Sequence, residues 1–280
     1  MLNITDLQQE AQRQGVSLHV VLKEKVQKIL LYGMFEQGFF PSLVFQGGTA
    51  LRLFYGGTRY SEDLDFVLAK PDKDFLSKLP EKLKGLKNPV EKFLPLGAEV
   101  QLRVQKKTST FHCYVLSIRL EGLPAKDKTP IEIANVPSYD PQIKMIQDAD
   151  LGLSPAVSVE SPQEILSDKI CAFGDRKYVK GRDLWDIFFL KTTLRVGVNE
   201  AVRSMVLKKI QDYGSEEQVF RHKFKERLAD LQKDGTPILK AEMDKFLPRV
   251  YRNLYEPQYG TIVREVGELL VAFHESQASR

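Results

Sequence analysis

The sequence has few of the residues that mark secreted, zinc-binding or membrane-spanning proteins. Its two cysteines, Cys113 and Cys171, lack metal-ligand spacing, and none of its four histidines is paired with cysteine or serine as zinc binding or nucleophilic catalysis requires. No segment reaches the ~18 consecutive apolar residues of a transmembrane helix, and the N-terminus has no apolar signal core. We therefore expect a cytoplasmic protein that is neither exported nor associated with a membrane.

A strong excess of charge of one sign is also absent. The chain carries 41 basic and 37 acidic residues, so its net charge of +4 does not by itself indicate a polyanionic partner. Basic residues gather locally, over 176–182 and 203–227. Both runs suit phosphate contacts, and solvated helix faces explain them equally well. With 42% apolar and 28% charged residues in a length of 280, the chain is a folded protein large enough for two packed lobes.

A pair of glycines stands between a short apolar segment and the start of a helical pattern. Residues 42–46 predict a strand and residues 49–55 predict a helix. Gly47 and Gly48 predict a turn beside the helix N-terminus, where free N–H groups and the helix dipole suit an anion. Glycine also lets a phosphate approach the backbone, and Thr49 adds a hydroxyl. A turn that serves only to reverse the chain is the alternative.

Two aspartates occupy alternate positions where the next apolar segment, residues 64–69, begins. Successive strand residues point to opposite faces, so Asp63 and Asp65 project to one side while Leu64 and Phe66 face the core. Carboxylates that close repel each other unless cations neutralise them, and two Mg²⁺ ions about 3.5–4 Å apart would do so while bridging a triphosphate. A solvated edge strand is the alternative for an isolated acidic pair. The glycine turn upstream favours a metal-held triphosphate.

The rest of the first half predicts helices and strands together, which indicates an α/β lobe with a mixed sheet. Apolar positions at helical spacing predict a helix over 17–37, and a charged helix is expected over 73–86. Strands are expected over 100–104, 111–120 and 131–136, because these segments alternate or run apolar and are rich in β-branched residues.

The second half predicts helices alone. Ser161 to Glu164 form a capping box with proline at the first helical position, which marks a helix start. Further helices are expected over 183–190, 201–213, 220–231, 239–247 and 262–275, with Gly197, Gly214, Gly235, Pro237 and Pro257 between them. The fold class is therefore α+β, with a first lobe over 1–158 and a helical lobe over 159–280.

The glycine turn and the acidic pair together resemble a known signature. Residues 47–53 (GGTALRL) and 59–66 (RYSEDLDF) are similar to the motif of the DNA polymerase β nucleotidyltransferase superfamily, and most similar to the AbiEii/MenT-type toxins of toxin–antitoxin and abortive-infection systems. Thr49 stands where the superfamily usually has serine. Residues 164–172 and 182–187 resemble the later motifs of that family. The similarity covers most of residues 40 to 190, and the last ninety residues match only in being helical.

The resemblance implies a set of metal-binding carboxylates. It makes Asp63 and Asp65 ligands of catalytic Mg²⁺, or of Mn²⁺ in its place, and it implies a third carboxylate on a neighbouring strand. Glu132 is the best candidate because it is an acid flanked by isoleucines, although an outward-facing strand residue is the alternative. Asp127 and Asp140 are weaker candidates because they are expected in polar turns.

The resemblance also implies residues that bind the nucleotide. It makes Lys169 both a triphosphate ligand and a catalytic residue, with an ordinary surface lysine as the alternative. It places Asp183 and Asp186 in the active site, the first with the nucleotide and the second among the catalytic residues, and spacing does not tell which acid is closer. Arg182 shares a helix face with Asp186, so a structural arginine–carboxylate clamp is also possible.

The remaining residues around these motifs receive simpler interpretations. The nucleotide-binding set includes Gly47, Gly48, Thr49 and Arg52, and Arg52 and Arg59 flank the acidic pair where they can contact phosphate. Trp185 is expected in the core rather than as a platform for a base.

The function implied by the resemblance is a metal-dependent nucleotidyltransferase that uses an NTP and releases pyrophosphate. It would act as the toxin of a type IV-like system, with the tRNA 3′ end as acceptor and a cognate antitoxin as partner. The nucleotide is expected in a cleft that the helical lobe completes. Transfer to a protein or a small molecule, and a catalytically inactive nucleotide- or RNA-binding module, are the alternatives.

Overall fold

The computed structural model describes residues 2–121 and 126–278, which form helices and a mixed β-sheet. The predicted α+β class is confirmed. The chain divides into two compact units, one made of Met1–Gly56 with Tyr60–Glu160 and the other of Gly57–Arg59 with Ser161–Arg280. The division after Glu160 lies close to the predicted one after residue 158, but the short segment Gly57–Arg59 belongs to the helical unit despite its position in the chain.

The first unit is built on a seven-stranded sheet with strand order β3-β4-β5-β2-β1-β7-β6. Strand β2 pairs antiparallel with β1 and parallel with β5, and β1 also pairs parallel with β7, so the sheet is mixed as predicted. The strands are β1 Leu43–Gln46, β2 Leu64–Leu68, β3 Glu99–Lys107, β4 Phe111–Arg119, β5 Asp127–Pro137, β6 Pro141–Met145 and β7 Ala156–Glu160. The sequence patterns do not predict β6 or β7.

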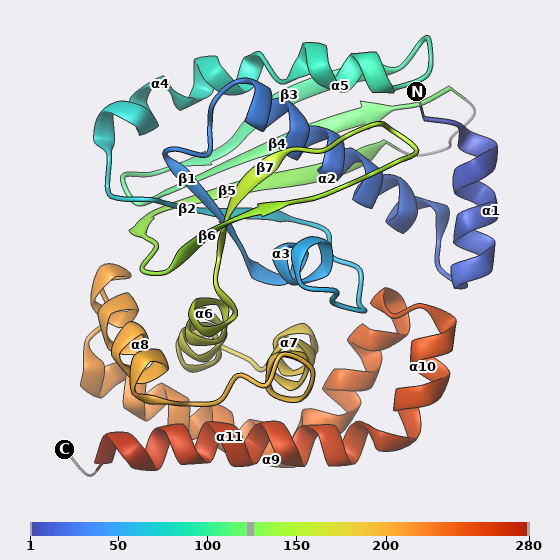
Figure 1. Cartoon of the computed structure of the whole chain (residues 1–280). Coiled ribbons are helices and arrows are strands. Elements are labelled where there is room, and N and C mark those ends of the chain that lie inside the picture. The colour runs from blue at the N-terminus through green and yellow to red at the C-terminus, as the bar shows by residue number, and fades with distance from the viewer. Residues whose placement is uncertain (1, 122–125, 279–280) are drawn as a thin grey trace. The chain divides into compact units, whose positions relative to one another are not determined.

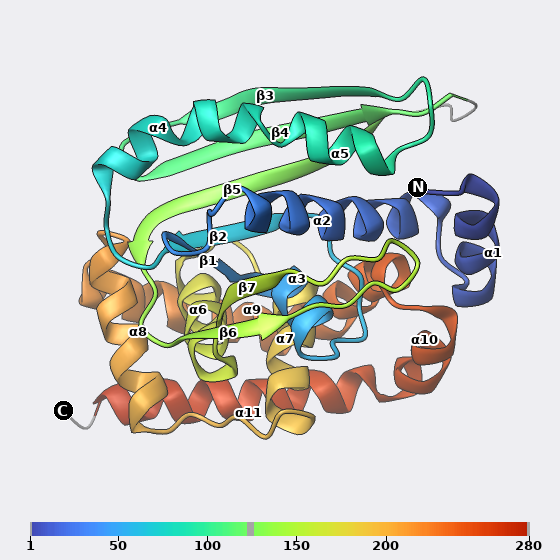
Figure 2. The ribbon, with the colours of Figure 1, turned by 45° about the horizontal axis from the view of Figure 1, so that its top comes forward.

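Helices cover one face of this sheet (Figures 1 and 2). The helices of the unit are α1 Ile4–Gln14, α2 Leu18–Glu36, α3 Gly47–Phe54, α4 Lys73–Lys84 and α5 Lys87–Phe93. Helix α2 contacts β5, and α4 and α5 contact β3. Under them lie strand residues such as Leu64, Phe66 and Ile131, all of which are fully buried. Because strand side chains alternate, the residues between these point to the opposite face, and Asp65 is among them.

The second unit consists of packed helices. They are α6 Pro162–Asp175, α7 Gly181–Thr192, α8 Glu200–Asp212, α9 Glu217–Phe246, α10 Arg249–Tyr255, the short 3₁₀ turn Glu256–Gln258 and α11 Tyr259–Ala278. Helices α9 and α11 run side by side, and α6 and α7 pack on α9 (Figures 1 and 2). The predicted start of α6 is confirmed, because the Ser161 hydroxyl accepts a hydrogen bond from the Glu164 N–H at 3.2 Å.

Two predictions about local structure are wrong. The sequence predicts a break at Gly235 and Pro237, yet both lie inside the continuous helix α9. A Cβ on Gly235 would come within 2.7 Å of the Val263 side chain, so this glycine allows close packing of α9 on α11 rather than ending a helix. Asp127 is not in a polar turn: it is the first residue of β5 and only 2% exposed, with Lys23 Nζ 3.5 Å from its carboxylate.

Candidate active site

Three carboxylates of the first unit lie at the start of β2 and in the middle of β5. Asp65 lies in β2 directly opposite Glu132 of β5, so the two side chains share one face of the sheet. Asp63 precedes β2 by one residue. All three residues are half-buried, whereas Leu64 between the aspartates is fully buried. The predicted alternation of acidic and apolar side chains is therefore present in the fold.

Cys113 lies beside this group of carboxylates. It pairs with Glu132 across β4 and β5, and its Sγ is 4.0 Å from Glu132 Oε1. Burial raises the pKa of the Cys113 thiol to about 11, with further contributions from the negative charges of Glu132, Asp63 and Asp65. The negative charges of all three carboxylates act on this thiol, so each of them lies near Cys113.

The two glycines, predicted as a turn before the helix, are the first residues of α3, and Gly47 lies directly against this acidic group. Gly47 follows β1 with φ at +79°, a conformation that favours glycine. A Cβ placed on Gly47 would lie 2.7 Å from Asp65 Oδ2, closer than real Cβ contacts allow. Gly47 is therefore required twice, once by its backbone conformation and once by the approach of the carboxylate. Gly48, the next residue, is buried.

The Thr49 hydroxyl holds the acidic segment against α3. Thr49 is fully buried, and its Oγ1 donates a hydrogen bond to the backbone carbonyl of Asp63 at 2.5 Å. This bond joins the start of α3 to the residue before β2. Thr49 therefore positions Asp63 through the backbone, and its hydroxyl is directed at the protein.

Arg52, expected beside the phosphates, is half-buried against α2. Its Nε donates to Glu24 Oε2 at 2.7 Å, and its guanidinium lies 4.2 Å from the centroid of the Tyr60 ring. Burial and, to a smaller extent, the nearby Glu24 charge raise the pKa of Tyr60 to about 12. These contacts fix the Arg52 side chain on the side of α3 that faces α2.

The second unit contains a buried network of charged side chains. Arg59 Nε and Nη2 each donate to one oxygen of the Asp186 carboxylate at 2.6 Å. Lys169 Nζ lies 2.7 Å from Asp186 Oδ2 and 2.9 Å from Asp183 Oδ1, and Arg176 pairs with the other oxygen of Asp183. Each carboxylate therefore binds Lys169 and one arginine.

Burial and neighbouring charges shift the pKa values in this network. Burial lowers the pKa of Lys169, against the opposing effect of Asp186. Burial alone would raise the pKa of Asp186, but the charges of Arg59 and Lys169 outweigh it, so that pKa is lowered. The network therefore favours the charged form of the buried Asp186 carboxylate.

The arginine that clamps Asp186 differs from the one suggested by helical spacing. The side chain of Arg182 lies over the Phe246 ring at 5.1 Å, and its backbone N–H donates to Glu242. Arg59 takes the clamp position instead, from a point 127 residues away in the chain. Trp185 is 2% exposed and packs edge-on against Tyr255, which confirms its expected place in the core.

The predicted residues therefore fall into two groups, one in each unit. The first unit brings together Gly47, Gly48, Thr49, Asp63, Asp65 and Glu132, with Arg52 on the adjoining helix. The second brings together Lys169, Asp183 and Asp186. The sequence does not predict the pairing of Arg59 with Asp186 or of Arg176 with Asp183, because no local pattern links these arginines to their partners.

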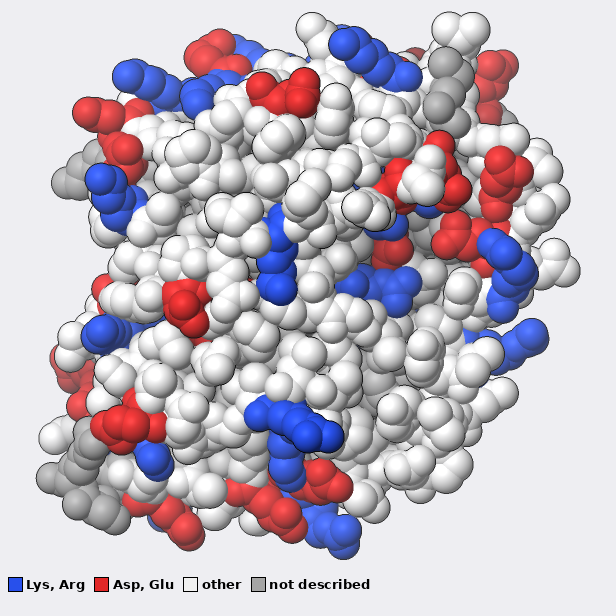
Figure 3. Space-filling model, in the orientation of Figure 1, with Lys and Arg blue, Asp and Glu red and all other residues white. Residues whose placement is uncertain are grey.

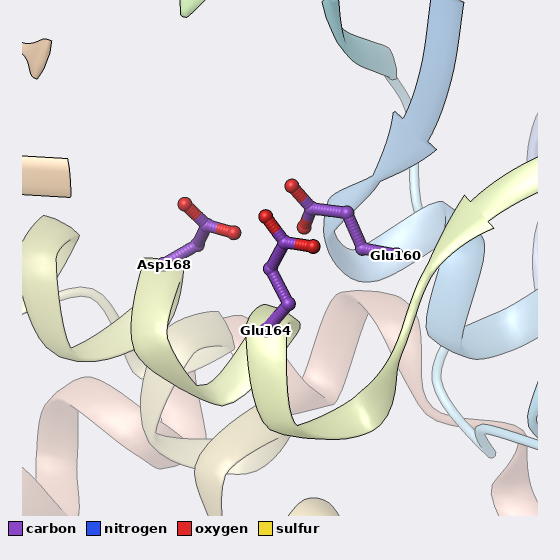
Figure 4. A group of neighbouring side chains, drawn as sticks. All are labelled: Glu160, Glu164 and Asp168. Atoms are coloured by element: carbon purple, nitrogen blue, oxygen red, sulfur yellow. The ribbon is translucent and has the colours of Figure 1, made fainter. Parts of the chain in front are cut away.

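A further acidic pair on α6 has a lysine as its counterion. Glu164 and Asp168 project from successive turns of α6 (Figure 4). Lys209 Nζ, fully buried, lies 2.9 Å from Glu164 and 2.8 Å from Asp168. Glu160, drawn with them, ends β7, and its backbone carbonyl accepts a hydrogen bond from the Tyr55 hydroxyl at 2.6 Å. The Lys209 ammonium offsets part of the negative charge of the helical pair, so the three side chains form an ion-pair cluster.

The acidic group of the first unit has the donor set that Mg²⁺ prefers. Carboxylate oxygens on neighbouring strands are hard ligands suited to this ion, and no nitrogen or thiolate donor need take part. The close approach of Asp65 to Gly47 leaves backbone rather than a side chain beside the carboxylates. Asp63, Asp65 and Glu132 therefore fit a magnesium site.

The basic run over 203–227 is largely engaged in surface ion pairs. Within it, Arg203 pairs with Glu200 and Arg221 with Glu217. On the face of the molecule drawn in Figure 3, basic and acidic side chains are interspersed. These observations favour solvated helix faces for this run. Among the helices that the structure describes, none is both long and apolar enough for a bilayer crossing.

Comparison with known proteins gives one family and two similar structures. The family model described as "Nucleotidyl transferase AbiEii toxin, Type IV TA system" matches residues 29–265. No curated protein matches the chain. The crystal structure of JHP933 from Helicobacter pylori is 20% identical, with a TM-score of 0.56 over 94% of this chain and 95% of that one. A Helicobacter pylori "putative nucleotidyltransferase" is 19% identical, with a TM-score of 0.55 over 94% and 98%. At this identity the two structures establish a shared fold.

Proposed function

This chain belongs to the AbiEii nucleotidyl transferase toxins of type IV toxin–antitoxin systems, and we propose that it transfers a nucleoside monophosphate from an NTP to the 3′ end of a tRNA. Membership implies a nucleotide substrate and an antitoxin partner. The observation that carries the proposal is the convergence of Asp63, Asp65 and Glu132 beside the Gly47 turn.

Asp63, Asp65 and Glu132 are the residues that would hold Mg²⁺, or Mn²⁺ in its place. The ion would neutralise charge on the triphosphate and make the acceptor hydroxyl easier to deprotonate. The three half-buried carboxylates would fix the ion at the start of β2 and beside β5. Glu132, opposite Asp65, also lies where it can orient the acceptor hydroxyl.

The reaction exchanges one phosphorus–oxygen bond for another. The acceptor oxygen attacks the α-phosphorus of the NTP, and the bond between the α-phosphorus and its bridging oxygen breaks. Pyrophosphate leaves with the bonding electrons, and the hydroxyl proton passes to solvent or to a carboxylate. Catalysis in such transfers is mainly positioning and stabilisation of charge.

Phosphate binding is assigned to the glycine turn and the lysine network. The half-buried backbone of Gly47, at the start of α3, is proposed to receive phosphate oxygens. Lys169 is proposed to contact the triphosphate, because its ammonium is held in one position by Asp183 at 2.9 Å and Asp186 at 2.7 Å. Asp183 and Asp186 then act by holding Lys169 in place.

Labelled nucleotide transfer tests the proposal. The full chain is incubated with Mg²⁺ and each α-labelled NTP in turn, with total RNA, protein extract or small hydroxyl compounds as acceptor. We expect label in the RNA fraction, and loss of that label for Asp65→Asn. Glu81→Gln is the matched control, since Glu81 lies on α4 with a side chain 76% exposed. Label in protein or small molecules alone would exclude the RNA acceptor, and equal labelling by Asp65→Asn would exclude the site.

A further inference from the structure

The face of the sheet that carries the carboxylates continues, exposed, across β4 and β3. On β4 the residues Tyr114, Leu116 and Ile118 are buried, whereas Val115 and Ser117 between them are half-buried. On β3 nearly every residue is exposed. The helices α4 and α5 contact β3, and the acidic face of these strands keeps solvent access.

One row of paired residues leads from this exposed surface to the acidic group. Lys106 of β3 pairs with Cys113 of β4, Cys113 pairs with Glu132 of β5, and Glu132 pairs with Asp65 of β2. Neighbouring strands lie about 4.8 Å apart, so the row spans about 14 Å from Lys106 to Asp65. A chain lying along the row would thus have one end at the carboxylates and its continuation on β3.

The side chains around this row are basic, polar and aromatic. Arg103, Gln105, Lys106 and Lys128 are exposed, and Phe111 and Val115 are half-buried. We call these six residues the β3–β5 platform. Arg103 lies opposite Val115, in the row next to that of Lys106. The platform has three positive charges and no carboxylate of its own.

A bulge in β3 adds side chains to the platform where it borders the acidic group. The register shifts between Val104 and Lys106, and both Gln105 and Lys106 reach the acidic face. Gln105 Oε1 lies 3.4 Å from Cys113 Sγ, and Lys106 Nζ lies 5.6 Å from the centroid of the Phe111 ring. Bulges commonly redirect side chains beside functional sites.

We propose that the β3–β5 platform binds the RNA acceptor strand, with its terminal hydroxyl at Asp65 and Glu132 and the preceding nucleotides over β4 and β3. The inference rests on the proposed function, because it takes the carboxylate group as the transfer site. Arg103, Lys106 and Lys128 contact phosphates, and Phe111 offers a ring on which a base stacks. A basic sheet face that carries an aromatic side chain is a common way to bind single-stranded RNA.

Charge favours a polyanion over a protein segment as the occupant. Arg103 makes one intramolecular hydrogen bond, to Gln101, and Lys106 faces an aromatic ring, so both retain their charge for a partner. The carboxylates at the end of the row hold cations in the proposed reaction, so they do not repel the end of an RNA strand. Three phosphate contacts would also make the binding depend on salt concentration.

The test compares RNA binding and transfer by the full chain with those of Arg103→Gln/Lys106→Gln. A short fluorescent single-stranded RNA with a free 3′ hydroxyl is titrated without NTP. We expect the double variant to bind it about tenfold more weakly and to lower the salt slope by about 1.4, since each single-strand contact contributes about 0.7. In transfer assays the KM for RNA rises, while the KM for NTP does not change.

A matched control separates this surface from general charge loss. Lys84→Ala/Lys92→Ala removes two exposed lysines from α4 and α5, on the other face of the sheet, and should bind RNA as the unchanged chain does. If Arg103→Gln/Lys106→Gln leaves the RNA affinity and the KM for RNA unchanged, the platform does not bind RNA. An equal loss of RNA affinity in the control variant would contradict the proposal as well. The RNA titration does not require catalysis. If RNA binding depends on the platform but no nucleotide is transferred, the proposed function is rejected and the platform is not.

Discussion

The Asp65 carboxylate occupies the space that a side chain on Gly47 would need. Its Oδ2 lies 2.7 Å from the position of a Cβ on that glycine, whose φ is +79°. Gly47 directly follows β1, whose last residue Gln46 pairs with Asp65 of the antiparallel strand β2, and the two motifs are separate in the sequence. The glycine turn and the acidic pair are therefore one structural unit, in which each limits what the other can be.

Gly47→Ala is expected to displace Asp65 and abolish transfer. The left-handed backbone alone costs an alanine about 1–2 kcal/mol, and the contact with the carboxylate adds to this. Gly38→Ala is the matched control, because Gly38 has φ at +65° and no heavy atom within 4 Å of its Cβ position. Transfer rates and thermal midpoints are measured for both. Equal activity of the two variants would show that the carboxylate does not depend on Gly47.

Arg59→Ala is expected to destabilise the protein strongly. The substitution removes the two hydrogen bonds that Arg59 donates to the buried Asp186 carboxylate. Breaking such a buried ion pair typically costs about 3–5 kcal/mol. Arg59→Lys keeps the positive charge but cannot donate the two parallel hydrogen bonds of a guanidinium. The stability of this variant should therefore lie between that of the unchanged chain and that of Arg59→Ala. Arg221→Ala, which breaks a surface pair with Glu217, should cost at most about 1 kcal/mol. Urea unfolding followed by circular dichroism ranks the variants, and equal losses for Arg59→Ala and Arg221→Ala would contradict the network.

Acid should weaken the protein partly through Asp186. The pKa of this group in the folded state lies below the ordinary 3.8, so near and below that value the unfolded chain binds the proton more readily. The stabilisation is complete above pH 3.8 and is lost as the pH falls through the folded pKa. Unfolding free energies measured across the acidic range should show a shallower pH dependence for Asp186→Asn. An unchanged slope would remove Asp186 from the account.

Removal of magnesium should stop transfer without unfolding the chain. Binding of Mg²⁺ to the folded state alone adds about 2.7 kcal/mol at a hundredfold excess over Kd. A rise in thermal midpoint on adding Mg²⁺ is therefore expected for the unchanged chain, and little rise for Asp63→Asn. Chelation should reverse the shift. A shift of the same size in Asp63→Asn would place the ion elsewhere.

The sequence is sufficient for those features that depend on local pattern. Alternation predicts the shared face of Asp63 and Asp65, and the capping box predicts the start of α6, because both depend on neighbours in the chain. Gly235 wrongly predicts a helix break. The glycine is needed for close packing against Val263, a contact that only the tertiary structure shows. The Arg59–Asp186 clamp escapes prediction for the same reason.

Asp127 is a second residue whose position depends on tertiary contacts that local pattern does not show. A polar flank and a nearby proline suggest a turn, yet the residue is buried beside Lys23, a lysine from α2 far earlier in the chain. Glu132, by contrast, is placed correctly in a strand, because the isoleucines on either side of it define a buried face. Its pairing with Asp65 depends on the strand order, which local pattern does not specify.

The most direct test of the central claim is the rate of nucleotide incorporation into RNA by Glu132→Gln. At saturating Mg²⁺ and NTP, the account predicts a loss of about 10²–10³-fold relative to the unchanged chain, with normal folding, because one group that stabilises charge in the transition state is removed. Glu81→Gln, measured beside it, should retain the full rate. A Glu132→Gln variant that incorporates nucleotide as fast as Glu81→Gln would contradict the assignment of these carboxylates as the catalytic centre.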